Sequence, residues 1–421
     1  MEILKISGPG KLGGSIEVQG SKNAVLPMLA SSLLNRGITR LYNCPDISDV
    51  RDAAVILEYI GCKVEFSNGV ITVDSSGEIT NHIPVEIMSR IRASFLFAGA
   101  LLARCRSFTL SQPGGCNIGL RPIDIHLESF RKLGARVETS LADIVCTMDR
   151  VTPCDLTLRF PSVGATENIM ILSCAAKGKI RIVNAAREPE IVDLQNMLNA
   201  MGAHITGAGT GVVVIEGTDS FNDVDYTVMP DRVDAATYLC ALSCAGGSIE
   251  IKNAEPAHLM SYINVLRKCS LDIETSPGMI TAQKTGRLKG GVDITTNPYP
   301  GFPTDMQSLL MAALSLSDGV SLIKENIFEN RFCLAGILSS MGADIRIYRR
   351  TASVRGVRSL SSVRATVCDL RAGAALAAAM MSCDGVSELC NIGLIDRGYE
   401  RFCEKYQSLG VNIERIEESE G

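Results

Sequence analysis

A pattern that recurs about every 70 residues is the feature of this sequence that most limits its fold. Six segments combine the end of a helical stretch, a stop residue and an alternating strand pattern: EYIGCKVEF, RKLGARVET, NAMGAHITG, RKCSLDIET, SSMGADIRI and QSLGVNIER. Their stop positions are Gly61, Gly134, Gly202, Ser270, Gly342 and Gly410, at steps of 73, 68, 68, 72 and 68 residues. Glycine suits the left-handed position just past a helix. The spacing therefore predicts six copies of one supersecondary unit.

A second signature lies upstream of most of these stops, where a glycine is followed six residues later by an asparagine. It occurs at Gly37 and Asn43, at Gly178 and Asn184, at Gly247 and Asn253, and at Gly385 and Asn391, with GVSLIKEN (319–326) as a near copy. Apolar helical stretches such as SKNAVLPMLASSLL and RVDAATYLCALSCA precede it. One unit thus reads helix, strand, helix, strand, turn, strand.

The two ends of the chain are predicted to share a domain. The sixth unit stops at GVNIERIEESEG without the second strand of its hairpin, and the strand-like EILKIS has no helix before it. We expect residues 1–20 to complete the last repeat. The predicted fold is α/β, with a lobe of repeats one to three over 21–229 and a lobe of repeats four to six over 1–20 plus 230–421.

Charge and apolar runs exclude several classes of protein. With 41 Lys+Arg against 46 Asp+Glu, the net charge is −5, so no overall basic field favours nucleic acid. The most apolar runs, 93–103 and 372–382, are shorter than the roughly 20 residues that span a bilayer. We therefore expect a soluble, cytoplasmic protein without nucleic-acid or membrane partners; the oligomeric state is open.

Cysteine and histidine usage argues against a metal site. The 15 cysteines contain no CxxC pair and many lie in apolar runs, which favours reduced thiols. The four histidines are not paired at ligand spacing. The sequence predicts neither a metal nor a cofactor.

Ionisable residues gather where the predicted helices begin. These starts carry Lys22-Asn23, Arg92, Arg121-Pro122, Asp231-Arg232, Thr304-Asp305, Arg331, Asp369 with Arg371, and Asp396-Arg397. Taken singly, such an aspartate is usually a helix cap and such an arginine a solvated surface residue. Their recurrence at equivalent helix starts, where N–H groups and the helix dipole already attract anions, predicts a cationic cleft for a multiply anionic small molecule.

Cys116 differs from the other cysteines because it lies in the glycine-rich segment SQPGGCNIGLRPIDIH. A loop cysteine beside arginine is a candidate for reactivity, since positive charge favours the thiolate. The residues alone leave a catalytic and a structural role equally open.

At these positions the chain resembles the enolpyruvyl transferase family, and specifically its branch in peptidoglycan precursor synthesis. The segments that carry the resemblance are GSKNAVLP (20–27), IRAS (91–94), PGGCNIGLRPIDIH (113–126), PSVGATENIM (161–170), AAREPEIVDL (185–194), PYPGFPTDMQ (298–307), ENIFENRF (325–332), DLRAGAAL (369–376) and IDRGYE (395–400). The resemblance implies a pair of inside-out α/β barrels with three repeats each.

The resemblance also implies an activity and a set of site residues. Enolpyruvyl would pass from phosphoenolpyruvate to the 3′-hydroxyl of UDP-N-acetylglucosamine, with release of phosphate. Phosphoenolpyruvate would contact Lys22, Asn23, Arg121, Arg331, Arg371 and Arg397. The nucleotide sugar would contact Asn23, Arg92, Arg121, Pro122, Ile123, Asp124, Ile125, Ser162, Val163, Gly164, Asp305 and Ile327. Catalysis would rest on Cys116 as general acid and fosfomycin target, Asp305 as base, and Lys22, Arg397 and Asp369 around the tetrahedral centre.

Three alternatives stay open at this stage. The sister enzyme 5-enolpyruvylshikimate-3-phosphate synthase shares fold and chemistry but lacks the cysteine loop. An RNA 3′-phosphate cyclase would need a nucleotide-linked histidine and an RNA surface. A catalytically silent paralogue that senses UDP-N-acetylglucosamine would not need to keep both acid and base.

Overall fold

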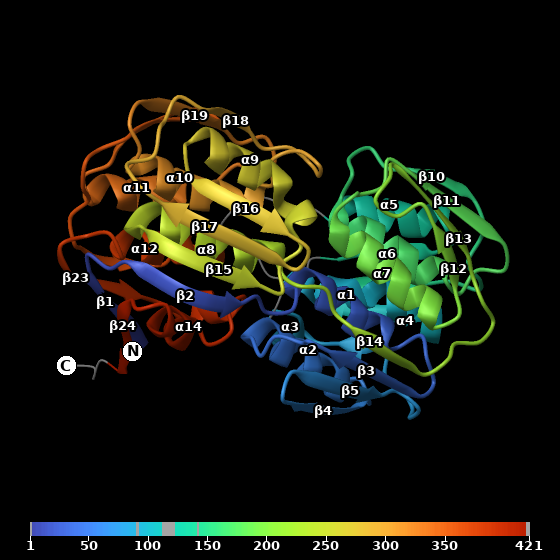
Figure 1. Ribbon diagram of the computed structural model, residues 1–421. Coiled ribbons are helices and arrows are strands. Elements are labelled where there is room, and N and C mark those ends of the chain that lie inside the picture. Colours follow the sequence, from blue (N-terminus) through green and yellow to red (C-terminus); the bar gives the residue numbers. More distant parts are fainter. Residues whose placement is uncertain (1, 90–91, 112–122, 141–142, 418–421) are drawn as a thin grey trace. The chain divides into compact units, whose positions relative to one another are not determined.

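Six four-stranded sheets, one for each repeat, cover the outside of the fold in Figure 1. The computed structural model describes residues 2–89, 92–111, 123–140 and 143–417. The chain divides into two compact units, which we call the middle unit (described residues within 20–229) and the terminal unit (2–19 with 230–417). Within the described residues, no helix is both long and apolar enough to cross a membrane.

All six sheets share one topology, in which an edge strand runs parallel to its neighbour and the other pairs are antiparallel. The middle unit holds the sheets β14 (Val224–Thr227), β3 (Ile38–Tyr42), β5 (Val70–Asp74), β4 (Lys63–Ser67); β6 (His82–Ile83), β7 (Ser107–Ser111), β9 (Asp143–Thr147), β8 (Arg136–Thr139); and β10 (Asp155–Thr157), β11 (Lys179–Val183), β13 (Val212–Glu216), β12 (His204–Thr206). The terminal unit holds β2 (Leu12–Glu17), β15 (Gly247–Lys252), β17 (Met279–Lys284), β16 (Asp272–Ser276); β18 (Asp293–Thr295), β19 (Val320–Lys324), β21 (Thr351–Arg355), β20 (Asp344–Tyr348); and β22 (Arg364–Thr366), β23 (Gly385–Cys390), β1 (Glu2–Gly8), β24 (Asn412–Glu417).

The first helix of each repeat lies inside its unit, is mostly apolar and has buried residues on every face. In the middle unit these inner helices are α1 (Lys22–Ser31), α4 (Phe97–Cys105) and α6 (Val163–Ser173), and in the terminal unit α8 (Arg232–Ala245), α10 (Gln307–Ser315) and α12 (Leu370–Met380). Each set of three packs together at the centre of its own core. A helix without a polar face is stable only when surrounded, which explains why the sheets lie outside and the helices inside.

Further helices complete each unit. The middle unit adds α2 (Ser48–Tyr59), α3 (Val85–Met88), η1 (Arg92–Leu96), α5 (Asp124–Lys132) and α7 (Pro189–Ala200). The terminal unit adds η2 (Pro256–Leu259), α9 (Met260–Lys268), η3 (Thr304–Met306), α11 (Cys333–Ser340), α13 (Gly393–Asp396) and α14 (Phe402–Ser408).

The stop residues of the repeats have the backbone conformation that their positions predict. The φ angle is +112° at Gly61 and +88° at Gly410, and Ser270, the one residue that is not glycine, also has a positive φ of 67°. The stop positions therefore share a backbone conformation rather than a residue type. Serine at position 270 adopts the positive φ that glycine adopts at no steric cost.

In four repeats, the asparagine of the second signature ties the repeat to its parallel edge strand. Asn43 has a φ of 56°, and its side-chain nitrogen donates to the carbonyl of Val228, just after β14. Equivalent side-chain bonds run from Asn184 to Leu158, from Asn253 to Val18 and from Asn391 to Val367. Asparagine tolerates the left-handed backbone and can still donate this bond, which explains why it recurs.

The N-terminal segment divides between two sheets. Strand β1, blue in Figure 1, pairs antiparallel with β23 and β24 and supplies the strand that the sixth repeat lacks. Strand β2 instead pairs in parallel with β15 of the fourth repeat. The expectation that residues 1–20 complete only the last repeat is wrong for β2, because the fourth sheet needs a parallel edge strand as every other sheet does.

Candidate active site

Four predicted site residues of the terminal unit form one charged cluster at the starts of η3, α11 and α12. Oδ1 of Asp305 accepts a bond from Nη2 of Arg331 at 2.9 Å, and its Oδ2 accepts one from Nη2 of Arg371 at 3.3 Å. Nη1 of Arg331 lies 4.0 Å from Oδ1 of Asp369. The two arginine side chains are 2% and 4% exposed, whereas that of Asp305 is 28% exposed. The cluster therefore presents one reachable carboxylate backed by two buried guanidinium groups.

Asp369 caps helix α12 and thereby fixes Arg371. Its Oδ1 accepts bonds from the backbone N–H groups of Arg371 at 2.8 Å and of Ala372 at 3.0 Å. The Arg371 guanidinium also donates to the Tyr399 hydroxyl at 3.3 Å and lies 5.6 Å from the centre of its ring. Burial acts to lower the pKa of Arg371, but the Tyr399 hydroxyl and nearby carboxylates outweigh that effect and raise it. Arg371 is thus a permanently charged group with a fixed position.

A buried carboxylate that the sequence did not single out, Glu325, organises the loop beside this cluster. Its Oε1 accepts bonds from the backbone N–H groups of Ile327 at 2.7 Å and Phe328 at 3.1 Å, and its Oε2 accepts one from the Thr304 hydroxyl at 3.0 Å. Glu325 therefore joins the residue before Asp305 to the predicted nucleotide contact Ile327. Only its place in the ENIFENRF segment could have pointed to it.

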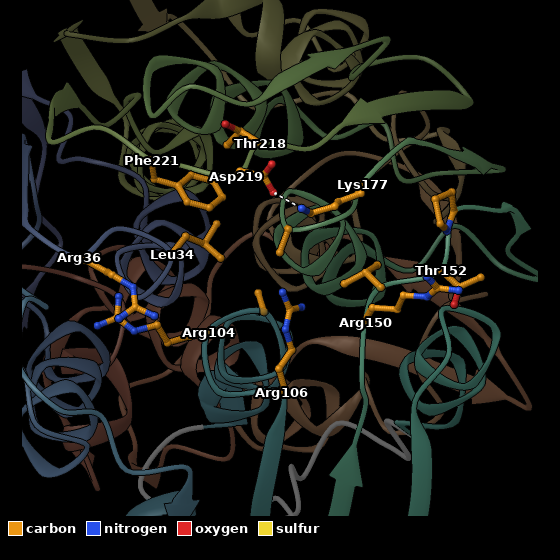
Figure 2. A pocket seen from close by; sticks show the side chains of 14 residues that line it. Leu34, Arg36, Arg104, Arg106, Arg150, Thr152, Lys177, Thr218, Asp219 and Phe221 are labelled. Carbon is orange, nitrogen blue, oxygen red and sulfur yellow. Dashed lines mark ion pairs between the residues drawn. The ribbon is translucent and has the colours of Figure 1, made fainter.

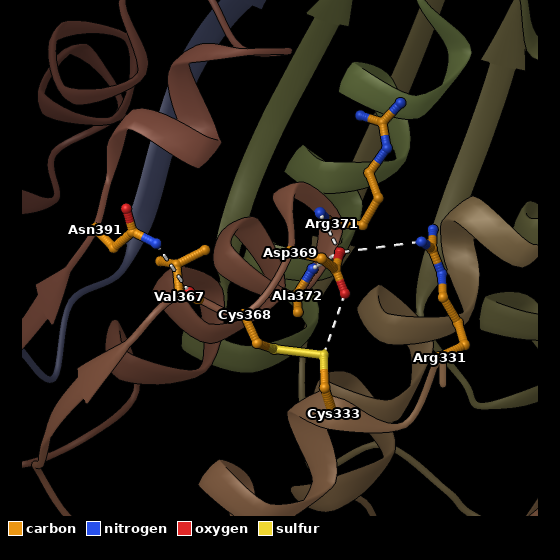
Figure 3. The surroundings of a disulfide bond; sticks show 8 residues. All are labelled: Arg331, Cys333, Val367, Cys368, Asp369, Arg371, Ala372 and Asn391. Atoms are coloured by element: carbon orange, nitrogen blue, oxygen red, sulfur yellow. Dashed lines mark hydrogen bonds and ion pairs between the residues drawn. A yellow bond between two sulfur atoms is a disulfide. The ribbon is translucent and has the colours of Figure 1, made fainter. Parts of the chain in front are cut away.

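A disulfide adjoins the charged cluster (Figure 3). It joins Cys333, the first residue of α11, to Cys368, next to the cap of α12, with their Cα atoms 6.5 Å apart. The expectation that all cysteines are reduced is wrong for this pair, because two helix starts bring their Cα atoms within bonding range. Sγ of Cys333 lies 3.2 Å from Oδ2 of Asp369. A disulfide sulfur has no proton, so this contact can become a hydrogen bond only in the reduced thiol.

The same three side chains are the one group of potential metal ligands that lies close together in the described part of the chain. The disulfide removes the thiolate charge that a soft metal needs from cysteine. In the disulfide form, Asp369 alone offers a ligand there.

Two further predicted residues of the terminal unit lie in neighbouring loops. Arg397 follows α13 as its C-cap residue and is partly buried. Ile327 follows strand β19 and is partly buried.

In the middle unit, Lys22 begins helix α1 and pairs with a residue that sequence reasoning missed. Its Nζ lies 2.6 Å from Oδ2 of Asp49 in helix α2, and the two side chains are 10% and 4% exposed. Asn23 follows it and is partly buried, and Ser21 caps the helix through its hydroxyl. Asp49 escaped attention because an aspartate in the first turn of a helix is ordinary in any sequence.

The other predicted contacts of this unit lie at the starts of α5 and α6. Ile123, Asp124 and Ile125 surround the first turn of α5, and Arg159 donates to the Asp124 carboxylate. At α6, the Ser162 hydroxyl accepts from the Ala165 N–H at 3.4 Å, and Val163 and Gly164 begin the helix. Helix starts of this kind offer free N–H groups to phosphate.

Several predicted residues cannot be placed. Cys116, Arg121 and Pro122 lie outside the described residues, and Arg92 begins η1 without a described side chain. The cysteines of the apolar runs behave as inert core residues, since burial raises the pKa of Cys44 and of Cys146 to about 12.

Comparison with known proteins identifies the family. Residues 6–406 match the model of EPSP synthase (3-phosphoshikimate 1-carboxyvinyltransferase). A UDP-N-acetylglucosamine 1-carboxyvinyltransferase 2 of Caldanaerobacter subterraneus is 44% identical over 99% of this chain and 100% of its own length. A UDP-N-acetylglucosamine 1-carboxyvinyltransferase of Thermotoga maritima is 41% identical over 99% of both chains. The chain belongs to the UDP-N-acetylglucosamine 1-carboxyvinyltransferase family. It is an enzyme of the carboxyvinyltransferase class.

Solved structures confirm the enolpyruvyl transferase fold. The enolpyruvyl transferase NikO from Streptomyces tendae superposes with a TM-score of 0.89, covers 98% of both chains and is 24% identical. EPSP synthase from Acinetobacter baumannii superposes with a TM-score of 0.75 over 99% of this chain and 100% of its own, at 16% identity. The predicted α/β fold of six repeats, three in each barrel, is confirmed.

Proposed function

We propose that this UDP-N-acetylglucosamine 1-carboxyvinyltransferase family member moves enolpyruvyl from phosphoenolpyruvate to the 3′-hydroxyl of UDP-N-acetylglucosamine. The hydroxyl oxygen attacks C2 of phosphoenolpyruvate and loses its proton, while the methylene carbon gains one. The tetrahedral intermediate then loses inorganic phosphate and a methyl proton, which restores the double bond. The product is a precursor of peptidoglycan, and both substrates are cytoplasmic metabolites, so we place the reaction in the cytoplasm.

The observation that carries this assignment is the carboxylate of Asp305 held between Arg331 and Arg371. Two buried guanidinium groups that face one partly exposed carboxylate form a site for a second carboxylate, because paired arginine donors match its two oxygens. We assign the carboxylate of phosphoenolpyruvate to these arginines. Asp305 then acts as the resident anion that the substrate displaces.

Displacement by the substrate carboxylate makes Asp305 a stronger base once phosphoenolpyruvate is bound. A carboxylate that accepts bonds from two guanidinium groups is a weak base, since those donors favour its charged form. When phosphoenolpyruvate takes over the donors, Asp305 regains proton affinity and can accept the proton of the attacking hydroxyl. Asp369, kept in place by its bonds to the start of α12, faces the same centre.

The remaining roles follow the family. Lys22 and Arg397, with Arg121, would bind the phosphate, and their charge would stabilise it as a leaving group. Cys116 would protonate the methylene carbon. The starts of α5 and α6, with Ser162 and Gly164, would receive the nucleotide, and Asn23 would orient the sugar hydroxyl.

The decisive assay measures phosphate release from phosphoenolpyruvate by the purified chain. We expect release that depends on added UDP-N-acetylglucosamine, with shikimate 3-phosphate inactive in its place. Release with shikimate 3-phosphate would overturn the substrate assignment. UDP-N-acetylglucosamine binding without release would instead identify a silent sensor, against which the intact Asp305 cluster argues.

A further inference from the structure

A strongly cationic cavity lies at the opposite end of the middle unit from Lys22. It has a volume of about 560 Å³ and is lined where the inner helices α1, α4 and α6 end. Helix α1 has 10 residues and so separates its start from this end by about 15 Å. The cavity is thus distinct from the proposed substrate contacts of this unit, and nothing proposed above uses it.

Five cations and one carboxylate line this cavity (Figure 2). They are Arg36, Arg104, Arg106, Arg150, Lys177 and Asp219. Each of the three helix ends contributes only about half a negative charge. The cationic surplus therefore exceeds what the helix dipoles offset by roughly two to three charges, in a chain whose net charge is −5.

Among the described residues, two of these five cations bind other groups of the protein, and three do not. Arg104 donates to the carbonyls of Asn35 at 2.7 Å and Ser75 at 2.9 Å, which joins the segment after α1 to the segment after β5. Lys177 pairs with Asp219 at 3.4 Å. Within the described residues, no hydrogen bond or ion pair engages the side chains of Arg36, Arg106 and Arg150. These three keep their donors available to a ligand.

The corresponding end of the terminal unit shows what the fold alone requires. There Lys284 donates to the carbonyls of Ser243 and Cys244, at the end of α8. Arg287 donates to the carbonyls of Leu316 and Ser317, just after α10. Both cations thus bind backbone carbonyls of the protein, as Arg104 does. Arg36 and Arg106 stand where the terminal unit has Gly246 and Gly247, Asp318 and Gly319, or Asp384 and Gly385.

Arg106 stands where the repeat pattern places glycine. The equivalent residues of the other five repeats are Gly37, Gly178, Gly247, Gly319 and Gly385. Arg106 has a φ of 61°, a conformation that costs a residue with a side chain about 1–2 kcal/mol. Figure 2 shows its side chain extending toward Lys177 and Asp219. Because this backbone conformation is unfavourable for arginine and the side chain points into the cavity, the charge of Arg106 is expected to have a function there.

We propose that this cavity binds a small molecule with a polyphosphate group. Arginine forks match phosphate oxygens in pairs, and the volume lies in the range of sites for nucleotide-sized ligands. Leu34 and Phe221 provide an apolar patch on one wall, against which a base or another apolar portion can pack. Burial and the adjacent charge of Arg36 lower the pKa of Arg104, consistent with cations held close together without an anion.

The test titrates inorganic tripolyphosphate and ATP into the full-length protein by calorimetry at low salt. Arg106→Gly restores the residue of the sister repeats, and Arg150→Gln removes a second charge. We expect each to weaken tripolyphosphate binding at least five-fold, while KM for both substrates stays unchanged. Arg349→Gly is the matched control, because Arg349 also has a positive φ, 54°, but lies in the β20–β21 hairpin.

The possible results of these titrations can be told apart. Equal tripolyphosphate affinity in wild type and Arg106→Gly would overturn the proposal, as would the absence of binding to wild type. ATP binding that exceeds tripolyphosphate binding and falls in Phe221→Leu would identify a nucleotide as the ligand class, whereas equal binding would restrict recognition to the phosphates. Because substrate turnover is measured separately, failure here leaves the proposed reaction untouched.

Discussion

Nη2 of Arg331 donates to Oδ1 of Asp305 across 2.9 Å, from a side chain that is almost entirely buried. The bond orients the carboxylate that we propose as general base. Asp305→Asn keeps the shape but removes the proton acceptor, so we expect kcat to fall by roughly 10²–10⁴. The KM for phosphoenolpyruvate should stay level or fall, since the arginines no longer hold a competing anion. Steady-state phosphate release measures both quantities.

Asp305→Glu serves as the control, because it retains a carboxylate at a shifted position and should recover part of kcat. A kcat for Asp305→Asn within three-fold of wild type would contradict the role of Asp305 as base.

Asp49 is predicted to position Lys22 for the substrate phosphate. Asp49→Asn removes the carboxylate charge that lies 2.6 Å from the largely buried ammonium group of Lys22. We expect KM for phosphoenolpyruvate to rise about ten-fold, with a smaller change in kcat, and the unfolding temperature to fall. Initial rates over a range of phosphoenolpyruvate concentrations provide the first readout, and thermal unfolding the second.

Asp52→Asn, in the same helix α2, is the matched control for Asp49→Asn and should leave KM unchanged. If Asp49→Asn lowers the unfolding temperature but not the apparent affinity for phosphoenolpyruvate, Asp49 is only structural.

The sequence predicts the repeats well because each depends on local chemistry. The positive φ that ends a helix, as at Gly61 or Ser270, can be predicted from a few neighbouring residues. Contacts between residues of two different elements cannot be predicted in this way. The bond from Glu325 to Thr304 and the disulfide from Cys333 to Cys368 depend on how two elements align, which periodicity does not determine. The repeat pattern predicts that charged helix starts gather, but it does not determine which of their side chains pair.

Asp234 predicts a pH dependence of stability. It lies buried in the first turn of α8, and burial raises its pKa from 3.8 to about 6, although Lys405 acts in the opposite direction. The folded protein thus binds this proton more tightly than the unfolded chain does. The contribution of Asp234 to stability therefore falls as pH rises from about 4 to about 6 and is constant above that range.

Asp234→Asn should remove this penalty, because the amide oxygen can still accept from the Gln19 N–H. The free energy of unfolding relative to wild type should rise between pH 5 and pH 7, by no more than about 3 kcal/mol. Urea unfolding at pH 5, 6, 7 and 8 measures it. The exposed Asp272, changed to asparagine, should give no such rise. A difference between Asp234→Asn and wild type that does not vary with pH would contradict the assigned proton.

Reduction of the Cys333–Cys368 disulfide is predicted to lower stability. The bond closes a loop with a sequence separation of 35, for which loop entropy predicts about 2–4 kcal/mol. We expect dithiothreitol to lower the unfolding temperature measured by calorimetry. Thiol titration of the denatured, unreduced protein should find two fewer thiols than the 15 cysteines of the chain.

The double variant Cys333→Ser and Cys368→Ser separates this bond from other thiol effects. It should unfold at the temperature of the reduced wild type and show no further response to dithiothreitol. Because Oδ1 of Asp369 keeps its two backbone bonds in either state, the cap of α12 survives, and kcat should change less than three-fold. All 15 thiols reacting before reduction would show that the bond does not form in solution, and a larger loss of kcat would show that the disulfide itself orients Asp369.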